Sequence, residues 1–464
     1  QRKLTLFFVH IAEPVMYKQG YDTLIEERKR EKRKREKRKK KKRKEKIEKR
    51  EKVRRGKMRR NSGNEDKKSI KEASKNSSIF NKRDFSNFST IFRFECKKIL
   101  RNRLVTAACL IMLAFYLVIV IFYSSKWTGE EKIIQKAVSG RILDDELLGE
   151  LKEALYSEDK DSGRLFIEDG TNPYSALSYY VGNIFRKNYA DFDSRAFYEI
   201  IDEKMDKTMR EDELCYEGEI EFWNKQKQNI ERPLVWYNAD NFEQMRGAFS
   251  TYGIMGVLFA SLCLSQVYAR EYRQIKTGQM VFCTAKGKST VYFARLLAGC
   301  VFCVGYTTVI LIVILLISFL LYGTEGLHGA IQLIAPYTPM ALDIIGLIRI
   351  YVGLILATSL FYAVVALVLS QLLKNSVAVM GVMTGVSLLL YALIPHVPED
   401  NRILSQIIYY QPITVLEDFF YEFRTVCIGG HYFPVYQAAS AIYLLIAVLL
   451  VLAGHKSYLR FQVK

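Results

Sequence analysis

The stretch Leu104-Val-Thr-Ala-Ala-Cys-Leu-Ile-Met-Leu-Ala-Phe-Tyr-Leu-Val-Ile-Val-Ile-Phe122 is an unbroken apolar run without a charged side chain. A helix needs about 20 apolar residues to cross the hydrocarbon core of a bilayer, which is about 30 Å thick. The second half of the chain holds five further runs of roughly this length, which are Gly247–Ala269, Val291–Leu321, Leu347–Leu373, Val377–Ile394 and Ala438–Ala453. The sequence therefore predicts an all-α polytopic membrane protein with six transmembrane helices.

The first run is separated from the second by a long polar stretch, residues 124–246, with about 27 acidic and about 17 basic side chains. Helical periodicity over Glu130–Leu155 and Tyr179–Ile230 predicts a helical extracytoplasmic domain here, with Asp144 or Asp145 capping one helix. Four regions are predicted: a basic low-complexity tail and linker (1–84), an amphipathic entry helix with the first span (85–123), the extracytoplasmic domain (124–246) and a region with five spans (247–464). The fourth region also contains a cytoplasmic loop (270–290) and an outer hairpin (395–437).

The distribution of Lys and Arg predicts the side of the membrane on which each loop lies, because cytoplasmic loops carry an excess of these residues. Basic side chains lie before the first run, between the second and third, between the fourth and fifth, and after the sixth. With six spans, all four segments fall on one side. Residues 323–346, on the opposite side, contain no Lys or Arg. We therefore expect a multi-pass protein of the cell membrane with both termini in the cytoplasm.

Residues 24–60 consist almost entirely of Lys, Arg and Glu, and such a segment cannot bury enough apolar surface to fold. This composition favours a solvated tail over a segment that binds anionic lipid. Nucleic acid is not an expected partner, because no aromatic side chains are interleaved with the charges. Further along, Phe85–Leu100 places Phe88, Ile91, Phe92 and Ile99 among polar residues, which predicts an amphipathic helix on the cytoplasmic surface.

The outer segment 395–437 is rich in aromatic residues but is interrupted by Pro, Asp and Glu, so it is not expected to span the membrane. It predicts a helical hairpin at the outer interface, where aromatic rings are favoured. A substrate vestibule and an interfacial anchor both remain open for this hairpin. Cys215 and Cys427 are the two cysteines expected on the outer side, and a disulfide between them is not favoured.

The spans lack the residues that intramembrane chemistry requires. Their middles contain no Asp, Glu, Lys, Arg or His, which argues against ion-coupled transport and intramembrane catalysis. Arg295 and Arg349 lie near the ends of spans and are expected to reach the headgroups. The sequence Gly287-Lys-Ser-Thr290 lacks the earlier glycine of a phosphate-binding loop. No catalytic residue, cofactor or metal site is therefore predicted.

The loop between the second and third spans reads Ala269-Arg-Glu-Tyr-Arg-Gln-Ile-Lys-Thr-Gly278, continues to Ala285-Lys-Gly-Lys288 and reaches Arg295. It resembles the corresponding loop of type-2 permease subunits of ATP-binding-cassette transporters. The positions that carry the resemblance are Glu271, Gly278, Thr284, Lys286 and Arg295. The segment Phe92-Arg-Phe-Glu-Cys-Lys-Lys-Ile-Leu100 resembles the family's amphipathic entry helix, and the large outer insert resembles that of firmicute-type members.

The resemblance implies a transport subunit without ATPase activity of its own, driven by a separate cytoplasmic ATP-binding subunit and paired with a second permease. The residues expected to couple to the ATPase partner are Glu271, Arg273, Gly278, Phe282, Thr284 and Lys286. Small residues allow helices to approach closely, and those expected at the permease dimer seam are Gly253, Gly256, Gly381 and Gly385. Export of an amphipathic or peptide substrate is the expected activity. The alternative is a membrane-anchored sensor or scaffold whose outer domain binds a ligand or partner.

Overall fold

The computed structural model describes residues 88–124, 136–158, 166–167, 169, 171–185, 193–211, 217–273, 287–396, 402–421 and 423–460. All of these residues belong to one compact unit that begins at Ser86. The predicted basic tail, residues 1–84, lies outside the described residues.

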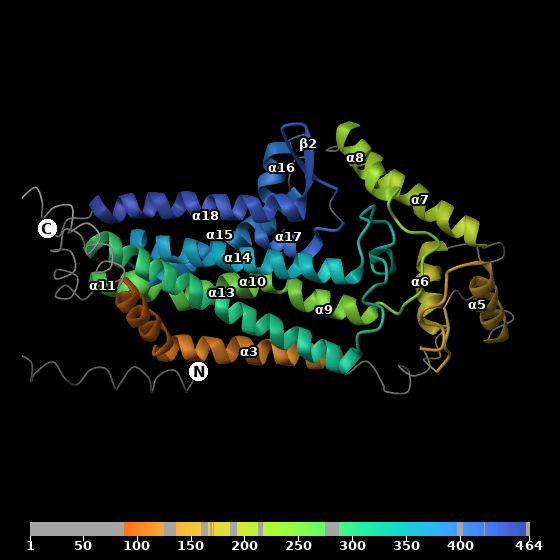
Figure 1. Cartoon of the computed structure of the whole chain (residues 1–464), viewed down its shortest axis with the longest axis horizontal. Helices are drawn as coiled ribbons and strands as arrows, with labels where there is room; N and C mark the ends of the chain where they lie inside the picture. The colour runs from red at the N-terminus through yellow and green to blue at the C-terminus, as the bar shows by residue number, and fades with distance from the viewer. Residues whose placement is uncertain are drawn as a thin grey trace, which may run out of the picture. The chain divides into compact units, whose positions relative to one another are not determined.

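Six helices in the described part are long and apolar enough to cross a membrane, and they confirm the predicted spans. They run back and forth along a common direction (Figure 1). The helices that form the bundle are α3 (Arg103–Ser124), α10 (Tyr252–Leu264) with α11 (Gln266–Arg273), α13 (Gly287–Tyr322), α14 (Ile344–Leu373), α15 (Ser376–Leu393) and α18 (Val435–Arg460). We call the end with the start of α13 and the α14–α15 turn the basic end, and the other the insert end.

Helix α14 lies at the centre of the bundle, where it packs against α10, α13, α15 and α18. In its most apolar stretch 56% of the residues are buried, whereas the value for α15 is 11%, so α15 is peripheral. Asp343 begins α14 by accepting a hydrogen bond from the Gly346 amide (2.9 Å). Lys374 ends it in the left-handed conformation (φ 54°), and Asn375 caps α15 by accepting from Val377 (3.1 Å). These caps make the tight turn that places α15 beside α14.

Residues between α3 and α10 form a helical insert, as predicted, but its elements differ from those expected. The helices are α5 (Asp145–Glu158), α6 (Ser175–Phe185), α7 (Ser194–Glu211), α8 (Glu217–Lys227) and α9 (Asp240–Ser250), the last leading into α10. The first helix starts at Asp145, and Asp144 caps it by accepting from the Leu147 amide (3.0 Å). The preceding residues turn, because Ile142 pairs with Val235 of the returning chain. The stretch 179–230, for which helical periodicity was predicted, contains most of α6 together with α7 and α8.

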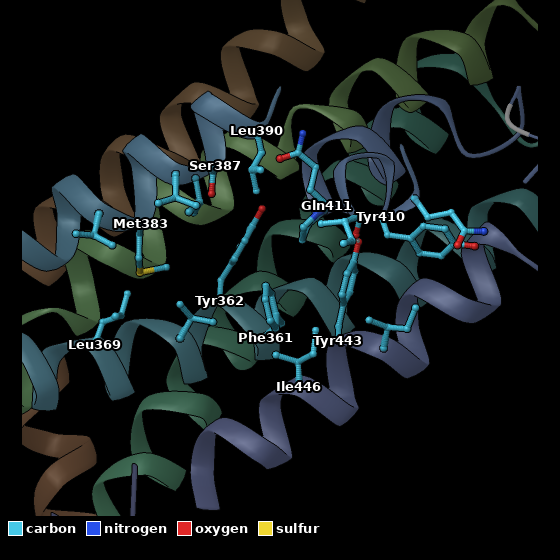
Figure 2. A pocket seen from close by; sticks show the side chains of 18 of the residues that line it. Phe361, Tyr362, Leu369, Met383, Ser387, Leu390, Tyr410, Gln411, Tyr443 and Ile446 are labelled. Carbon is cyan, nitrogen blue, oxygen red and sulfur yellow. Dashed lines mark hydrogen bonds between the residues drawn. The ribbon is translucent and has the colours of Figure 1, made fainter. Parts of the chain in front are cut away.

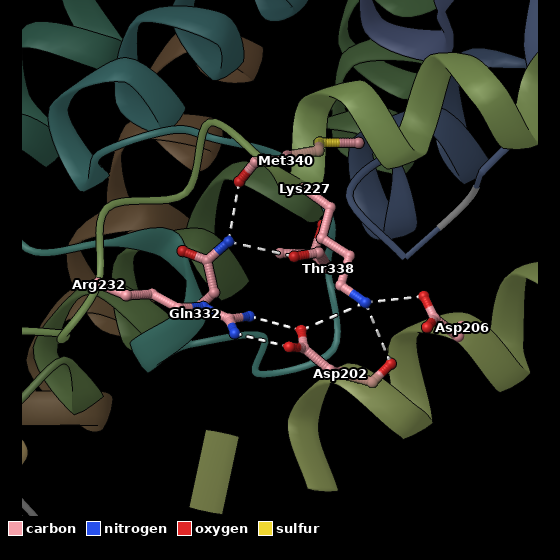
Figure 3. A network of polar contacts seen from close by, with 7 residues as sticks. All are labelled: Asp202, Asp206, Lys227, Arg232, Gln332, Thr338 and Met340. Carbon is pink, nitrogen blue, oxygen red and sulfur yellow. Dashed lines mark hydrogen bonds and ion pairs between the residues drawn. The ribbon is translucent and has the colours of Figure 1, made fainter. Parts of the chain in front are cut away.

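A network of ion pairs connects α7 to α8 and to the chain that follows α8 (Figure 3). Arg232 donates to both carboxylate oxygens of Asp202 (2.6 and 2.7 Å), and Lys227 contacts Asp202 and Asp206 (3.3 and 2.8 Å). Burial raises the pKa of Asp202, but the bonds from Arg232 and Lys227 outweigh this effect and lower it overall. The paired charges therefore fix α7 relative to α8 and to the returning chain.

Acidification is expected to destabilise the insert through Glu150 of α5. Hydrogen bonds from Arg141, and then from Tyr174, lower the pKa of Glu150 from 4.5 to about 2. Because the pKa of Glu150 is lower in the folded state, its carboxylate stabilises the folded insert fully above pH 4.5. This contribution to stability is lost as the pH falls towards 2. Glu150→Gln is expected to remove this part of the pH dependence of the insert's stability. Tryptophan fluorescence of the full chain during acid titration measures the unfolding. Glu153→Gln, at an exposed position of α5, is the control; equal acid transitions in both variants would contradict the assignment.

The segment 395–437, which is expected on the outer side, contains two helices, as expected, and a β-hairpin that was not predicted. Its elements are α16 (Arg402–Tyr409), α17 (Pro412–Asp418), β1 (Thr425–Ile428) and β2 (His431–Pro434). The strands pair antiparallel, and Gly429 and Gly430 connect them with positive φ angles. The Trp223 indole of α8 donates to the Phe423 carbonyl (2.8 Å), so the insert is attached to this hairpin. Cys427 is exposed on β1, whereas Cys215 lies outside the described residues.

Short 3₁₀ turns complete the insert end. They are η2 (Ile331–Leu333) before α14 and η3 (Ile394–His396) after α15. The buried Gln332 amide donates to the carbonyls of Thr338 and Met340 (3.1 and 2.9 Å), which holds the loop between α13 and α14 in place (Figure 3). Tyr180 of α6 donates to the Gln332 carbonyl (3.0 Å), so the same loop also contacts the insert.

Candidate functional site

The predicted coupling loop begins on α11 and ends on α13, at the basic end of the bundle. Glu271 and Arg273 belong to the last turn of α11. The remaining four expected coupling residues lie within 274–286, outside the described residues; they are Gly278, Phe282, Thr284 and Lys286. What the structure describes is therefore the framework from which the loop extends, and this framework is held together by four long-range polar contacts.

The first contact joins α11 to the central helix α14. The helix is interrupted at Ser265, between α10 and α11. Such an interruption leaves backbone amides and carbonyls at the two helix ends without their usual partners. Ser370 of α14 supplies new ones: its hydroxyl donates to the Ser265 carbonyl (2.6 Å) and accepts from the Tyr268 and Ala269 amides (3.2 and 3.1 Å). One side chain therefore bridges both sides of the break and ties α11 to α14.

Two further contacts join α11, α13 and α18 through tyrosine hydroxyls. Tyr268 of α11 donates to the Tyr292 carbonyl of α13 (2.9 Å), and Tyr292 donates to the Val451 carbonyl of α18 (3.0 Å). Both tyrosines are buried, so these bonds form away from competing water. Both helices that carry the loop are thereby linked to the body of the bundle.

The fourth contact is an ion pair between the entry helix, residues 88–100, and α13. Arg295 Nε lies 2.9 Å from Glu95 Oε1, and each side chain is 4% exposed. Lys98 approaches the second carboxylate oxygen (3.3 Å) from a position that is 34% exposed. The Arg295 guanidinium also lies 5.8 Å from the centre of the Tyr268 ring on α11. Three segments that are far apart in sequence therefore meet around one buried charge pair.

This arrangement corrects the expectation for Arg295, which was to reach the lipid headgroups. Its side chain instead points into protein, because Glu95 offers a partner that compensates the loss of hydration. The expected entry helix is present, but Glu95 and Ile99 are buried against the bundle, while Phe94 is exposed. The signal was present in the sequence: Glu95 shares a helix face with Phe92 and Ile99, where an unpaired carboxylate would be unfavourable.

The structure separates the four glycines expected at a seam between subunits. Gly253 and Gly256 are buried, and a Cβ atom on Gly253 would lie 2.7 Å from the Ile413 Cα of α17. Gly253 therefore permits a close contact inside this subunit. Gly381 and Gly385 lie on the exposed surface of α15, and nothing lies within 4 Å of a Cβ at either position. That surface is open to a second subunit or to lipid.

Comparison with known proteins places the chain in a family. No curated protein and no solved structure gives a significant match. A family model described as ABC-2 family transporter protein matches residues 130–455, well over half of the chain. The match includes the insert, five of the six spanning helices and the framework on α11, α13, α14 and α18. The chain thus belongs to the ABC-2 transporter family, as a multi-pass membrane permease.

Proposed function

We propose that a separate cytoplasmic ATP-binding subunit docks on loop 270–290 and drives this permease. The observation that carries the proposal is the framework of hydrogen bonds and a buried ion pair at the basic end. Ser370 ties α11 to α14, and the Glu95–Arg295 pair ties α13 to the entry helix. A displacement applied to the loop is therefore passed to several spanning helices at once, rather than absorbed by a flexible connection.

In this proposal ATP binding and hydrolysis rock the spanning helices between two arrangements, so that substrate is exported. The basic end faces the cytoplasm, together with both termini, as the distribution of Lys and Arg indicates. A second permease subunit packs along α15, whose exposed surface around Gly381 and Gly385 allows close helix contact. Gly253 and Gly256 are left out of this seam because they pack internally.

The proposed substrate is an amphipathic molecule or peptide. Support comes from a cavity of about 540 Å³ at the insert end, between α8, β2 and the loop before α14. Its lining combines aromatic side chains, such as Phe222 and Tyr432, with the charged side chains of Glu221 and Lys225. Such a mixed surface is suited to a ligand with both apolar and charged groups.

Copurification with a nucleotide-binding ATPase subunit, coexpressed with this chain, tests the docking site. Phe282→Asp is expected to lower the amount of ATPase that copurifies by about tenfold, because loss of one buried aromatic anchor often costs more than 1 kcal/mol. Glu271→Ala is expected to act in the same direction. Tyr156→Asp alters an exposed aromatic residue of the insert and serves as the control. If Phe282→Asp retains the ATPase as fully as the control, docking on this loop is wrong. If no ATPase copurifies even with the unaltered chain, a sensor or scaffold is favoured.

A further inference from the structure

A cavity of about 480 Å³ lies inside the bundle between α14, α15 and α18, and residues of α16 and α17 also line it (Figure 2). Its residues on α14 run from Phe361 to Leu369, which corresponds to about 12 Å along the helix axis. The cavity is therefore elongated along the bundle. Its volume falls within the range of about 300–1,000 Å³ that is typical of small-molecule sites.

The cavity has a buried floor and a mouth on the membrane-facing surface. Tyr362 and Met383 line the floor and are 3% and 4% exposed. Val386 of α15, Ile407 of α16 and Ile446 of α18 also line the cavity, but they are 50%, 62% and 38% exposed. A side chain that both lines a cavity and is exposed marks its opening. Because α15 and α18 span the membrane, the molecules that meet this opening are lipids.

Several polar groups of the lining are used within the protein. Tyr362 donates to the Gly253 carbonyl (3.0 Å), and Tyr443 donates to the Tyr410 carbonyl (2.8 Å). The Gln411 amide lies within hydrogen-bond distance of the Thr414 hydroxyl (3.0 Å). None of the residues that line the cavity is charged. A water molecule needs two to four polar partners in such a space, so the cavity favours an apolar occupant.

We propose that this cavity binds one hydrocarbon chain of a bilayer lipid. The hydrocarbon chain of the lipid enters between α15 and α18 and lies along α14, with its end near Leu369. The site lies within one subunit and is separate from the exposed α15 surface around Gly381 and Gly385. It rests on the membrane-spanning fold alone, so it holds whether or not an ATPase docks on loop 270–290. A bound chain fills the space between the peripheral helix α15 and the central helix α14, and thereby supports α15.

Photolabelling of the full chain in lipid vesicles tests the site. The vesicles contain phosphatidylethanolamine and phosphatidylglycerol, with a small fraction of phosphatidylglycerol that carries a diazirine in one acyl chain. Mass spectrometry of the labelled peptides is expected to find the label on the α14 residues that line the cavity, including the partly buried Val365 and Leu369. Leu390→Trp and Leu369→Trp fill the cavity, and each is expected to lower this labelling by about tenfold.

Each variant has a matched control on the same helix. Leu389→Trp on α15 and Leu372→Trp on α14 introduce the same side chain at positions that are 59% and 50% exposed and do not line the cavity. These controls are expected to label like the unaltered chain. Leu390→Ala, which widens the cavity, is expected to retain the label and so shows that a change at this position does not abolish labelling by unfolding the protein.

Two results would overturn the proposal. One is label found on the exposed side chains alone, with equal yields in the filled variants and their controls, as expected for lipid that merely surrounds the protein. The other is labelling of the α14 lining by a soluble short-chain amphiphile with the same diazirine but not by the phospholipid. That result would assign the cavity to a soluble ligand instead of a bilayer lipid.

Discussion

Arg295→Met is expected to destabilise the protein by about 3–5 kcal/mol, because it leaves the Glu95 carboxylate buried without its main partner. Both side chains are 4% exposed, so water cannot replace the lost interaction without opening the contact between the entry helix and α13. Thermal unfolding of the full chain in lipid nanodiscs measures the effect as a lower midpoint. In the proposed mechanism the same variant also weakens the coupling of ATP hydrolysis to transport.

Two further variants separate the charge pair from general packing. Glu95→Gln combined with Arg295→Met removes both charges and is expected to recover much of the lost stability, since a buried pair can often be replaced by neutral side chains. Lys98→Met removes the partly exposed partner of Glu95 and is expected to cost less than about 1 kcal/mol. The assignment is wrong if Arg295→Met lowers the midpoint no more than Lys98→Met does.

Gly253→Ala is expected to destabilise the subunit by about 1–3 kcal/mol, because the added methyl group overpacks the contact between α10 and α17. The new Cβ would lie 2.7 Å from the Ile413 Cα, which is a backbone atom and cannot rotate away. The hydrogen bond from Tyr362 to the Gly253 carbonyl would be strained by the same displacement. The loss is measured as a lower unfolding midpoint of the subunit in detergent.

Gly381→Ala is the matched control for this variant, since it makes the same chemical change at an open position of α15. Alanine favours helix over glycine by about 1 kcal/mol, so the unfolding midpoint is expected to stay the same or rise. If a second permease packs on this surface, Gly381→Leu is expected to weaken cross-linking between subunits without lowering the midpoint. Equal destabilisation by Gly253→Ala and Gly381→Ala would contradict the difference in packing.

The sequence predicted the spanning helices well because a bilayer imposes one simple requirement, namely about 20 apolar residues per crossing. The α14–α15 turn was also predicted, since Lys374 interrupts two apolar runs. The insert was predicted less well. Its helical character follows from periodicity, and the predicted cap at Asp144 is confirmed. The pairing of Ile142 with Val235, which are distant in sequence, was not predicted. The β-hairpin was missed although Gly429 and Gly430 are a recognisable turn signal.

The framework beneath loop 270–290 was beyond the reach of local patterns. Arg295 and Glu95 lie 200 positions apart, and Ser370 lies about 100 positions from the break that it bridges. Hydropathy and charge patterns report the environment that each segment prefers, but they do not specify which segments become neighbours. Composition and periodicity were therefore enough for the six crossings and the helical insert. The buried ion pair, the serine bridge, the internal role of Gly253 and the lipid-facing cavity required the packed helices, because each depends on side chains that meet across different elements.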